Sequence, residues 1–190
     1  MEDNFNFNYV GYFDISPIKD KLNEIGDNIW LEHTLRQSVF LAHKDTETVE
    51  FMWDIGSLNK IAKGKIHSNF YKFEIDTILN ELKPIYKKKY GDGEFLKVLL
   101  VKLKKNSKIS THVDNGKSLE ICKRTHIGVI TNPSVIFTVG GEVKHMKEGD
   151  IWEINNQKEH SVNNDSNMDR IHLIIDYLVN NISNIKINKS

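Results

Sequence analysis

The chain has a single cysteine, three prolines, no net charge and no long hydrophobic run. One thiol cannot form an intrachain disulfide, so no internal cystine cross-link holds the fold. The longest apolar runs, such as Leu99-Leu100-Val101, are far too short to cross a bilayer. The 26 basic residues are matched by 26 acidic ones. This balance argues against a protein dedicated to nucleic acid or to a membrane surface, because such proteins carry a basic excess.

What is present is the composition of an ordinary globular domain. Of the 190 residues, 39% are hydrophobic and 27% are charged, and this length suits one well-buried domain better than two. Residues 1–4 are acidic and polar, where a secretory signal would need a basic segment followed by an apolar one. Together with the single cysteine, this predicts a cytoplasmic protein. The sequence does not indicate an oligomeric state.

The N-terminal half predicts a mixture of helices and short strands. Apolar residues recur at helical spacing over residues 18–29, directly after a Ser-Pro pair that is typical of a helix start. The same spacing over residues 70–89 predicts a second helix, which ends near Pro84 or in the lysines after it. Residues 39–53 instead predict two short strands, separated by the polar segment 43–46.

Beyond residue 93 the chain consists of short β-branched and aromatic segments bounded by Gly, Asn, Asp or Pro. Six of them predict strands, over residues 95–105, 124–131, 134–139, 151–154, 160–163 and 170–179. Short strands separated by turns favour an antiparallel barrel or jelly roll. We therefore predict a single domain over residues 1–190 that is mainly β with flanking helices. Its N-terminal part, residues 1–92, is mixed, and residues 93–179 form a metal-binding β core.

Two histidines and an aspartate are the most informative residues of this β region. His112 and Asp114 are two positions apart, so on an extended chain both can point into one cavity, and His160 follows much later. Two imidazoles and one carboxylate are the ligands of a facial triad that holds Fe(II) and leaves three positions open for chemistry. The alternative is a set of polar surface residues, because a single His-x-Asp often occurs by chance. Together, the three predict a metal site.

An arginine follows the second histidine by ten residues (170 − 160 = 10). Arg170 starts an apolar strand, where burial of a guanidinium is costly unless an anion pairs with it. A carboxylate-bearing co-substrate would supply that anion through two parallel hydrogen bonds. A structural ion pair with Asp176 or Glu159 is the alternative.

Further residues are candidates for contacts with a co-substrate or substrate. Arg124 and His126 alternate along one strand, so both can face the cavity and donate hydrogen bonds to a carboxylate. Alternatively, they belong to a solvated face. Trp152, on a neighbouring strand, can line the pocket or fill the core. His43 and Arg36, from the N-terminal half, are candidates for substrate contacts.

Several short motifs of the β region resemble a known family. They are Arg124-x-His126-x-Gly128, Gly140-Gly141-Glu142, Glu148-Gly149-Asp150, Glu159-His160 and Asp169-Arg170-x-His172. Together with the ten-residue step from histidine to arginine, they make residues 95–179 similar to the aspartyl/asparaginyl β-hydroxylase family of 2-oxoglutarate oxygenases, which includes certain proline hydroxylases. A fainter similarity covers residues 40–46.

The resemblance implies a double-stranded β-helix, the cupin-like jelly roll. It also implies Fe(II) and 2-oxoglutarate as cofactors, with dioxygen as co-substrate. His112 and His160 would bind the iron, and Arg170 would bind the distal carboxylate of 2-oxoglutarate. Arg124 and His126 would lie near its proximal carboxylate.

Asp114 separates this chain from the vertebrate aspartyl hydroxylases of the family, which lack an acidic ligand at that place. In this respect it resembles the bacterial and proline-hydroxylase-like members. The implied activity is hydroxylation of an aspartyl, asparaginyl or prolyl side chain, free or within a peptide, with release of succinate and CO2. Two alternatives stay open: a cupin-type metal-dependent isomerase or hydrolase, which would not need Arg170, and a non-catalytic metal-binding β-barrel module.

Overall fold

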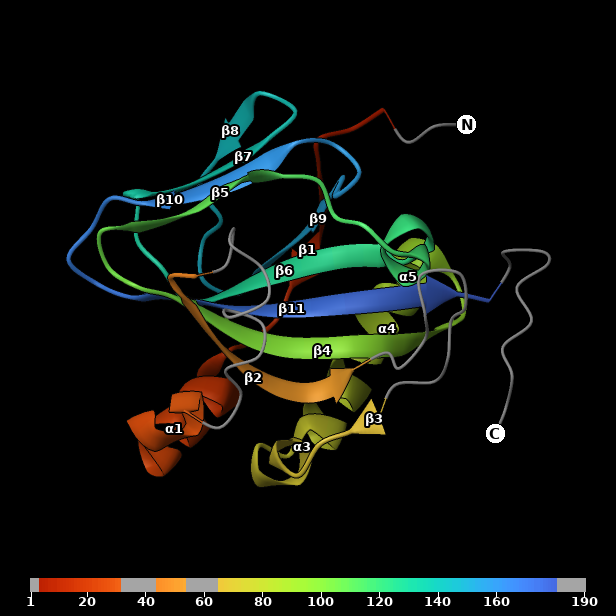
Figure 1. Ribbon diagram of the computed structural model, residues 1–190. Helices are drawn as coiled ribbons and strands as arrows, with labels where there is room; N and C mark the ends of the chain where they lie inside the picture. The colour runs from red at the N-terminus through yellow and green to blue at the C-terminus, as the bar shows by residue number, and fades with distance from the viewer. Residues whose placement is uncertain (1–3, 32–43, 54–64, 181–190) are drawn as a thin grey trace.

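The computed structural model describes residues 4–31, 44–53 and 65–180, and within them the chain forms two antiparallel sheets (Figure 1). The strands of the larger sheet are β1 (Phe7–Tyr12), β2 (Thr46–Trp53), β3 (Lys65–Ile66), β4 (Gly93–Leu103), β6 (Lys123–Ile130), β9 (Asp150–Ile154) and β11 (Arg170–Val179). Those of the smaller sheet are β5 (Ser107–His112), β7 (Val135–Val139), β8 (Glu142–Lys144) and β10 (His160–Asn164). Their orders are β1-β9-β6-β11-β4-β2-β3 and β5-β10-β7-β8, so strands far apart in sequence lie side by side.

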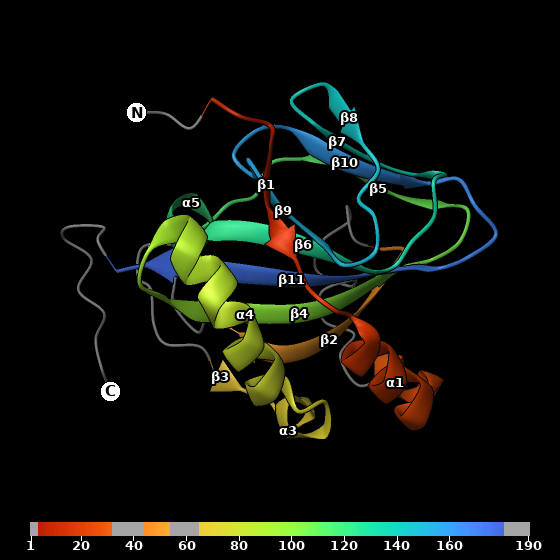
Figure 2. The same cartoon turned by 180° about the vertical axis from the view of Figure 1, so that it is seen from behind.

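The long helix α4 (Ile75–Tyr90) covers one face of the larger sheet (Figure 2). The helical segments of the described residues are α1 (Ser16–Ile25), the 3-10 helix η1 (Asp27–Leu31), α3 (Asn69–Lys72), α4 (Ile75–Tyr90) and α5 (Lys117–Ile121). Seen from behind, α4 crosses the sheet over β4, β11 and β6 (Figure 2). Its buried side chains pack in the main hydrophobic core with residues of these strands. The opposite face of the sheet meets the smaller sheet around a cavity lined by residues of both.

The alternation of side chains along β4 explains this arrangement. Val98 and Leu100 point toward the core beneath α4, whereas Leu99 and Val101 belong to a separate apolar cluster on the other face. All four are buried, because β4 is covered on both faces. A strand covered on both faces has a continuous apolar run in place of an alternating one, which is the pattern of residues 98–101.

The structure confirms the predicted fold class, a mainly β jelly roll with flanking helices. Each of the six predicted strands is present, with shifts of one or two residues at their ends. The sequence analysis missed four strands, β1, β3, β5 and β8, and β3 has only two residues. β5 is mostly polar and β8 has three residues, so neither has the β-branched, aromatic composition used for the prediction.

The two predicted helices are shorter than expected, because backbone conformation interrupts each of them. The first ends at Ile25, where Gly26 adopts a positive φ of 74°, and η1 follows. The second is divided into α3 and α4 at Glu74, which has a left-handed conformation with φ of 51°. The chain then continues through Pro84 and the lysines to Tyr90. Of residues 39–53, the structure describes β2, and the first predicted strand lies outside the described residues.

The N-terminal part also contributes to the β core. β1 pairs with β9, and β2 pairs with β4, so segments from before residue 92 extend the larger sheet at both of its sides. The predicted single domain over residues 1–190 stays a prediction. It agrees with this pairing, because the strands of residues 93–179 are continuous with those contributed by the N-terminal part.

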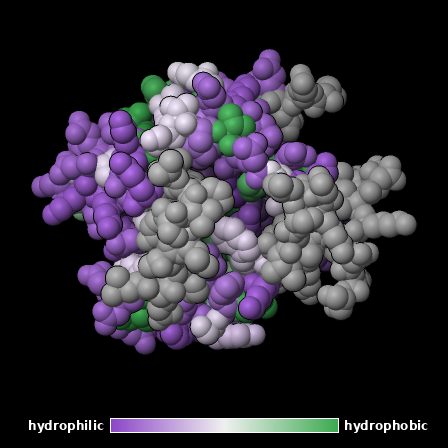
Figure 3. Space-filling model, viewed as in Figure 1, coloured by the Kyte–Doolittle hydropathy of each residue, from purple (hydrophilic) through white to green (hydrophobic). Residues whose placement is uncertain are grey.

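The described surface is predominantly hydrophilic. On the face shown in Figure 3, hydrophobic residues form small, separate areas among hydrophilic ones. The large apolar side chains that are exposed come from different elements and include Tyr12, Tyr71 and Val143. Among the described residues, no helix combines the length and the apolar character needed to cross a bilayer.

Gly128 of β6 allows the segment before β9 to approach closely. A Cβ atom at this position would lie 2.7 Å from the carbonyl oxygen of Lys147, and the Gly128 carbonyl accepts a hydrogen bond of 2.9 Å from the amide of Gly149. Backbone atoms cannot rotate away as a side chain can. We therefore expect Gly128→Ala to lower the free energy of unfolding by about 1–3 kcal/mol, measured by urea denaturation.

The matched control is Gly11→Ala in β1. A Cβ atom there would meet Cγ2 of Ile85 at 3.0 Å, and this side chain can adjust. The expected loss is below about 1 kcal/mol. Equal losses at the two glycines would contradict the explanation given for Gly128.

Candidate metal centre

The smaller sheet brings the two predicted histidine ligands together. His112 is the last residue of β5 and His160 the first of β10, and the antiparallel pairing of these strands places the two residues opposite each other. Their ring centroids are 4.3 Å apart. Asp114 lies in the loop after β5, where its amide donates a hydrogen bond of 3.1 Å to the carbonyl of Asn156. This bond holds the loop beside the start of β10.

The side chains of these three residues converge on one point. Nε2 of His112 lies 3.9 Å from Oδ1 of Asp114, and Nε2 of His160 lies 3.9 Å from its Oδ2. One potential ligand atom from each residue lies within 4.8 Å of the others. The His112, Asp114 and His160 group is therefore placed so that it could hold a metal ion.

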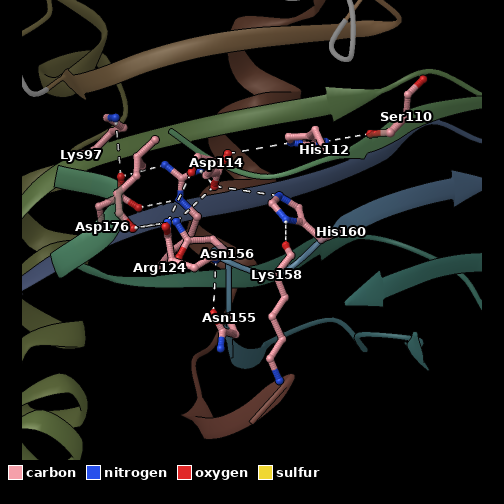
Figure 4. A network of polar contacts seen from close by, with 12 residues as sticks. Lys97, Ser110, His112, Asp114, Arg124, Asn155, Asn156, Lys158, His160 and Asp176 are labelled. Atoms are coloured by element: carbon pink, nitrogen blue, oxygen red, sulfur yellow. Dashed lines mark hydrogen bonds and ion pairs between the residues drawn. The ribbon is translucent and has the colours of Figure 1, made fainter. Parts of the chain in front are cut away.

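Both histidines are held in the tautomer that a metal requires. Nδ1 of His112 lies 2.8 Å from the carbonyl oxygen of Ser110, and Nδ1 of His160 lies 2.9 Å from that of Lys158 (Figure 4). A carbonyl can only accept, so each Nδ1 must carry the proton and each Nε2 keeps its lone pair. Burial lowers the pKa of His160, which favours the neutral form that can coordinate a metal.

The third candidate ligand is held as a carboxylate. Burial raises the pKa of Asp114, but Arg124, the two histidines and the hydrogen bond from Asn156 together outweigh this effect, so the pKa lies well below its ordinary value. Nη1 of Arg124 donates a hydrogen bond of 2.6 Å to Oδ2 of Asp114, and Nδ2 of Asn156 donates to the same oxygen at 3.3 Å. Asp114 is therefore ionised at neutral pH and fixed in orientation.

Arg124 has a second carboxylate partner. Its Nε and Nη2 donate to the two oxygens of Asp176 at 2.8 Å each, in the bidentate geometry typical of arginine. Nζ of Lys97 lies 3.6 Å from Oδ2 of Asp176. Arg124 is buried, so the alternative of a solvated face is wrong for this residue. The sequence analysis did not predict its pairing with Asp176.

Arg170 belongs to the same cavity as the three candidate ligands. Residues of both sheets line it: Val101, Ile109, His112, Asp114, Arg124, His126, Phe137, Ile154, His160, Val162, Arg170 and Ile174. The Arg170 side chain is buried, and its Nη2 donates to Nδ1 of His172 at 2.7 Å. Asp176, one of the alternative partners considered for Arg170, instead pairs with Arg124 and Lys97.

Two further histidines on the inner face of the larger sheet are buried and neutral. Burial, and then the charge of Arg170, holds the pKa of His126 and of His172 well below the usual value. A guanidinium has no acceptor, so Nδ1 of His172 must accept from Arg170 and the proton must reside on Nε2. Among the described residues, neither Nε2 of His172 nor Nδ1 of His126 has a hydrogen-bond partner.

These two histidines predict that the protein loses stability in mild acid. In the unfolded chain they bind protons below about pH 6.5, whereas their folded pKa is well below that value. The unfolded state then binds more protons, so the free energy of unfolding decreases as the pH is lowered, with a slope that approaches about 1.4 kcal/mol per pH unit for each histidine below about pH 6.5. Urea denaturation between pH 7.5 and 5.5 measures this slope.

The substitution His172→Asn removes one of the two titrating groups. We expect it to reduce the slope by about one proton, which is about 1.4 kcal/mol per pH unit. An unchanged slope would show that His172 does not titrate on unfolding in this range.

Of the three residues predicted to contact substrate, Trp152 is the one within the described part of the chain. Trp152 is partly buried, lies edge to face with Tyr9 at 5.1 Å, and has Nζ of Lys144 at 4.2 Å from its ring centroid. It is not among the residues that line the cavity, and its contact with substrate stays a prediction. His43 and Arg36 lie outside the described residues.

The sequence analysis assigned none of the supporting roles found here for Asp176, Asn156 and His172, although it named His172 in a motif and Asp176 as an alternative partner of Arg170. Two of them carried a usable signal. His172 and Asp176 follow Arg170 by two and six positions on one strand, and even spacing places all three on the same face. Asn156 lies in a loop, where no periodicity predicts the direction of a side chain.

Comparison with known proteins agrees with this geometry. Residues 36–179 match the family described as aspartyl/asparaginyl β-hydroxylase. The chain belongs to this family. The match extends further toward the N-terminus than the motifs of residues 95–179, and it includes all the candidate ligands as well as Arg170. No individually curated protein matches the chain.

Solved structures confirm the fold of this family member. An oxidoreductase of the 2OG-Fe(II) oxygenase family from Burkholderia pseudomallei has a TM-score of 0.57 at 15% identity, covering 95% of this chain and 98% of its own. The viral collagen prolyl hydroxylase of Paramecium bursaria Chlorella virus-1 has a TM-score of 0.56 at 11% identity, covering 93% and 98%. AviO1 from Streptomyces viridochromogenes has a TM-score of 0.58 at 11% identity, covering 95% and 92%.

Proposed function

We propose that this protein is an Fe(II)- and 2-oxoglutarate-dependent dioxygenase that hydroxylates an amino acid side chain. The observation that carries the proposal is the convergence of two imidazole lone pairs and one carboxylate in a cavity that also contains a buried arginine. This donor set suits Fe(II), because three protein ligands on one face leave positions for a co-substrate and dioxygen. Membership of the hydroxylase family supports the reaction type.

His112, Asp114 and His160 would hold the iron. When bound, it would supply the oxidation in which 2-oxoglutarate and dioxygen give succinate and CO2, and a C–H bond of the substrate becomes C–OH. The two backbone carbonyls behind the imidazoles keep the metal-binding nitrogens deprotonated. The protein thus contributes ligands that are already in the required protonation state.

Arg170 would bind the distal carboxylate of 2-oxoglutarate. Its guanidinium is buried and always charged, and it can pair with a carboxylate through two parallel hydrogen bonds. His126 lines the same cavity, and its Nδ1 has no hydrogen-bond partner among the described residues. It would lie near the proximal carboxylate. The apolar lining, including Ile109, Phe137 and Ile174, would exclude water from the reacting groups.

The substrate proposed is an aspartyl, asparaginyl or prolyl side chain, in a free amino acid or in a peptide. The family description supports the first two. The third draws on the similarity in fold to a collagen prolyl hydroxylase and on the acidic residue Asp114.

Anaerobic addition of Fe(II) and 2-oxoglutarate tests the proposal. The protein is expected to develop the weak visible charge-transfer band of the chelate, and to release succinate in air with one of the free amino acids or with short peptides that contain Asp, Asn or Pro. His160→Ala is the matched negative control. Absence of the band from the wild-type protein would refute the proposal. Turnover that persists without dioxygen and 2-oxoglutarate would instead favour a cupin-type isomerase or hydrolase.

A further inference from the structure

We infer that Arg124 and Asp176 are positioning residues for the metal centre, which orient Asp114 so that it binds the metal through one oxygen. The inference rests on the proposed function, because it concerns the same metal site. It assigns Arg124 a role different from the co-substrate contact predicted from its sequence motif. The argument starts from the register of three neighbouring strands.

Lys97, Asp176 and Arg124 lie in one row across the larger sheet, which we call the charged row. Asp176 of β11 pairs in register with Lys97 of β4 on one side and with Arg124 of β6 on the other. Each is buried, with exposed fractions of 6%, 1% and 7% respectively. The central carboxylate thus lies between two cations, which offsets the cost of burying its charge.

The next rows of the same three strands are not charged. Leu99, Ile174 and His126 form the second row, and Val101, His172 and Gly128 form the third. Well-packed apolar residues, such as Leu99 and Ile174, often stabilise a protein at least as much as a buried ion pair does. Stability alone therefore does not explain why the charged row is charged. The charged row, however, occupies the end of the sheet where the loop of Asp114 approaches.

Arg124 connects the charged row to that loop. Asp176 binds its Nε and Nη2 and so fixes the plane of the guanidinium, while Nη1 points out of the row and donates to Oδ2 of Asp114 (Figure 4). A rigid sheet thereby sets the orientation of a carboxylate that lies in a loop. Loop side chains generally hold a ligand geometry less precisely than residues of strands, and such outer partners compensate for this.

The hydrogen bonds to Asp114 also distinguish its two oxygens. Within the part of the chain that the structure describes, the side-chain donors to this carboxylate, Arg124 and Asn156, both contact Oδ2. Each oxygen lies 3.9 Å from a histidine Nε2, Oδ1 from that of His112 and Oδ2 from that of His160. Because Oδ2 already accepts both hydrogen bonds, an ion between the histidines would be bound through Oδ1, which keeps a coordination position open that a bidentate carboxylate would occupy.

Titration with Co(II), followed by its visible absorption, tests this role without any turnover. Asp176→Asn is nearly isosteric and touches no candidate ligand, yet it removes the charge that fixes Arg124. We expect the dissociation constant for Co(II) to rise about 10- to 100-fold, and the band shape to change because the carboxylate is no longer held to one oxygen. Arg124→Lys, which cannot bind both carboxylates in this geometry, should have the same effect.

Glu153→Gln is the matched control. Glu153 is a carboxylate of the same sheet, 3% exposed, that accepts hydrogen bonds from Asn8 and Tyr90 and pairs in register with Thr125, next to Arg124. Its loss is expected to lower the thermal midpoint without changing Co(II) affinity or spectrum. If Asp176→Asn does not fold, Arg124→Lys tests the positioning role in its place, because this variant keeps the positive charge and most of the side chain.

The outcomes separate this inference from the proposed function. Wild-type protein that binds no Co(II) would overturn the metal centre and this inference with it. Wild-type protein that binds Co(II), with Asp176→Asn and Arg124→Lys unchanged in affinity and spectrum, would overturn the positioning role alone. The positioning role would also be overturned if these two variants lost no more Co(II) affinity than Glu153→Gln, since such a loss would reflect general destabilisation.

Discussion

Replacing His160 with alanine is expected to abolish metal binding and, with it, the proposed hydroxylation. His160 starts β10, lies opposite His112, and has its Nε2 prepared for coordination by the bond from Nδ1 to the carbonyl of Lys158. Four-ligand zinc sites bind with about 10–16 kcal/mol, or about 3 kcal/mol for each ligand, so the dissociation constant should rise about 100-fold or more. Titration with Co(II) or Fe(II) under anaerobic conditions measures it.

The matched control is His145→Ala. His145 is partly buried on the segment after β8, with its Nδ1 3.3 Å from the carbonyl of Val135, and it is not among the residues that line the cavity. We expect its loss to leave the metal affinity within about twofold of the wild-type value, inside the usual scatter of a surface change. Comparable losses in the two variants, or full succinate production by His160→Ala, would refute the assignment of His160 as a ligand.

Arg170→Ala is expected to weaken the binding of 2-oxoglutarate strongly while leaving the metal affinity nearly unchanged. Hydrogen bonds that involve a charged group contribute about 1.5–3 kcal/mol each. Loss of a bidentate pair therefore predicts a rise in the 2-oxoglutarate dissociation constant of about 100-fold or more. Titration of 2-oxoglutarate into the anaerobic Fe(II) protein, followed by the charge-transfer band, measures this constant.

Arg170→Lys tests whether geometry or charge is decisive. A lysine keeps the positive charge but cannot form two parallel hydrogen bonds or donate to Nδ1 of His172 in the same plane. We expect an intermediate constant, closer to that of Arg170→Ala than to the wild type. If Arg170→Ala binds 2-oxoglutarate as the wild type does, the co-substrate is held elsewhere. If it instead loses metal affinity, Arg170 belongs to the structure of the metal site.

The strands of the C-terminal half were predictable because their apolar residues repeat with a clear pattern. β4 and β11 are buried on both faces and therefore read as continuous apolar segments. β5 was not predictable in the same way, since it is polar and has one buried residue, Ile109. Its place in the sheet depends on pairing with β10, a partner from a different part of the chain.

Within the site, local spacing identified the candidate ligands but not their support. The sequence shows directly that His112 and Asp114 are two positions apart and that Arg170 follows His160 by ten. The partner of Arg124 was not, because Asp176 lies 52 positions away and meets it only through the register of β6 and β11. Register is set by turns, bulges and core packing over the whole sheet, so the sequence of neither strand alone predicts it.

By itself, the sequence determined the types of the candidate ligands, the β-rich fold class and the family, because composition, spacing and short motifs are local properties of a chain. Three features were decided by the tertiary structure alone. Arg124 donates a hydrogen bond to Asp114, and Arg170 donates one to His172. Both metal-facing imidazoles keep a lone pair on Nε2. These are properties of atoms brought within about 3 Å of each other by hydrogen bonds. Such proximity depends on how separate strands are aligned, which residue identity leaves open.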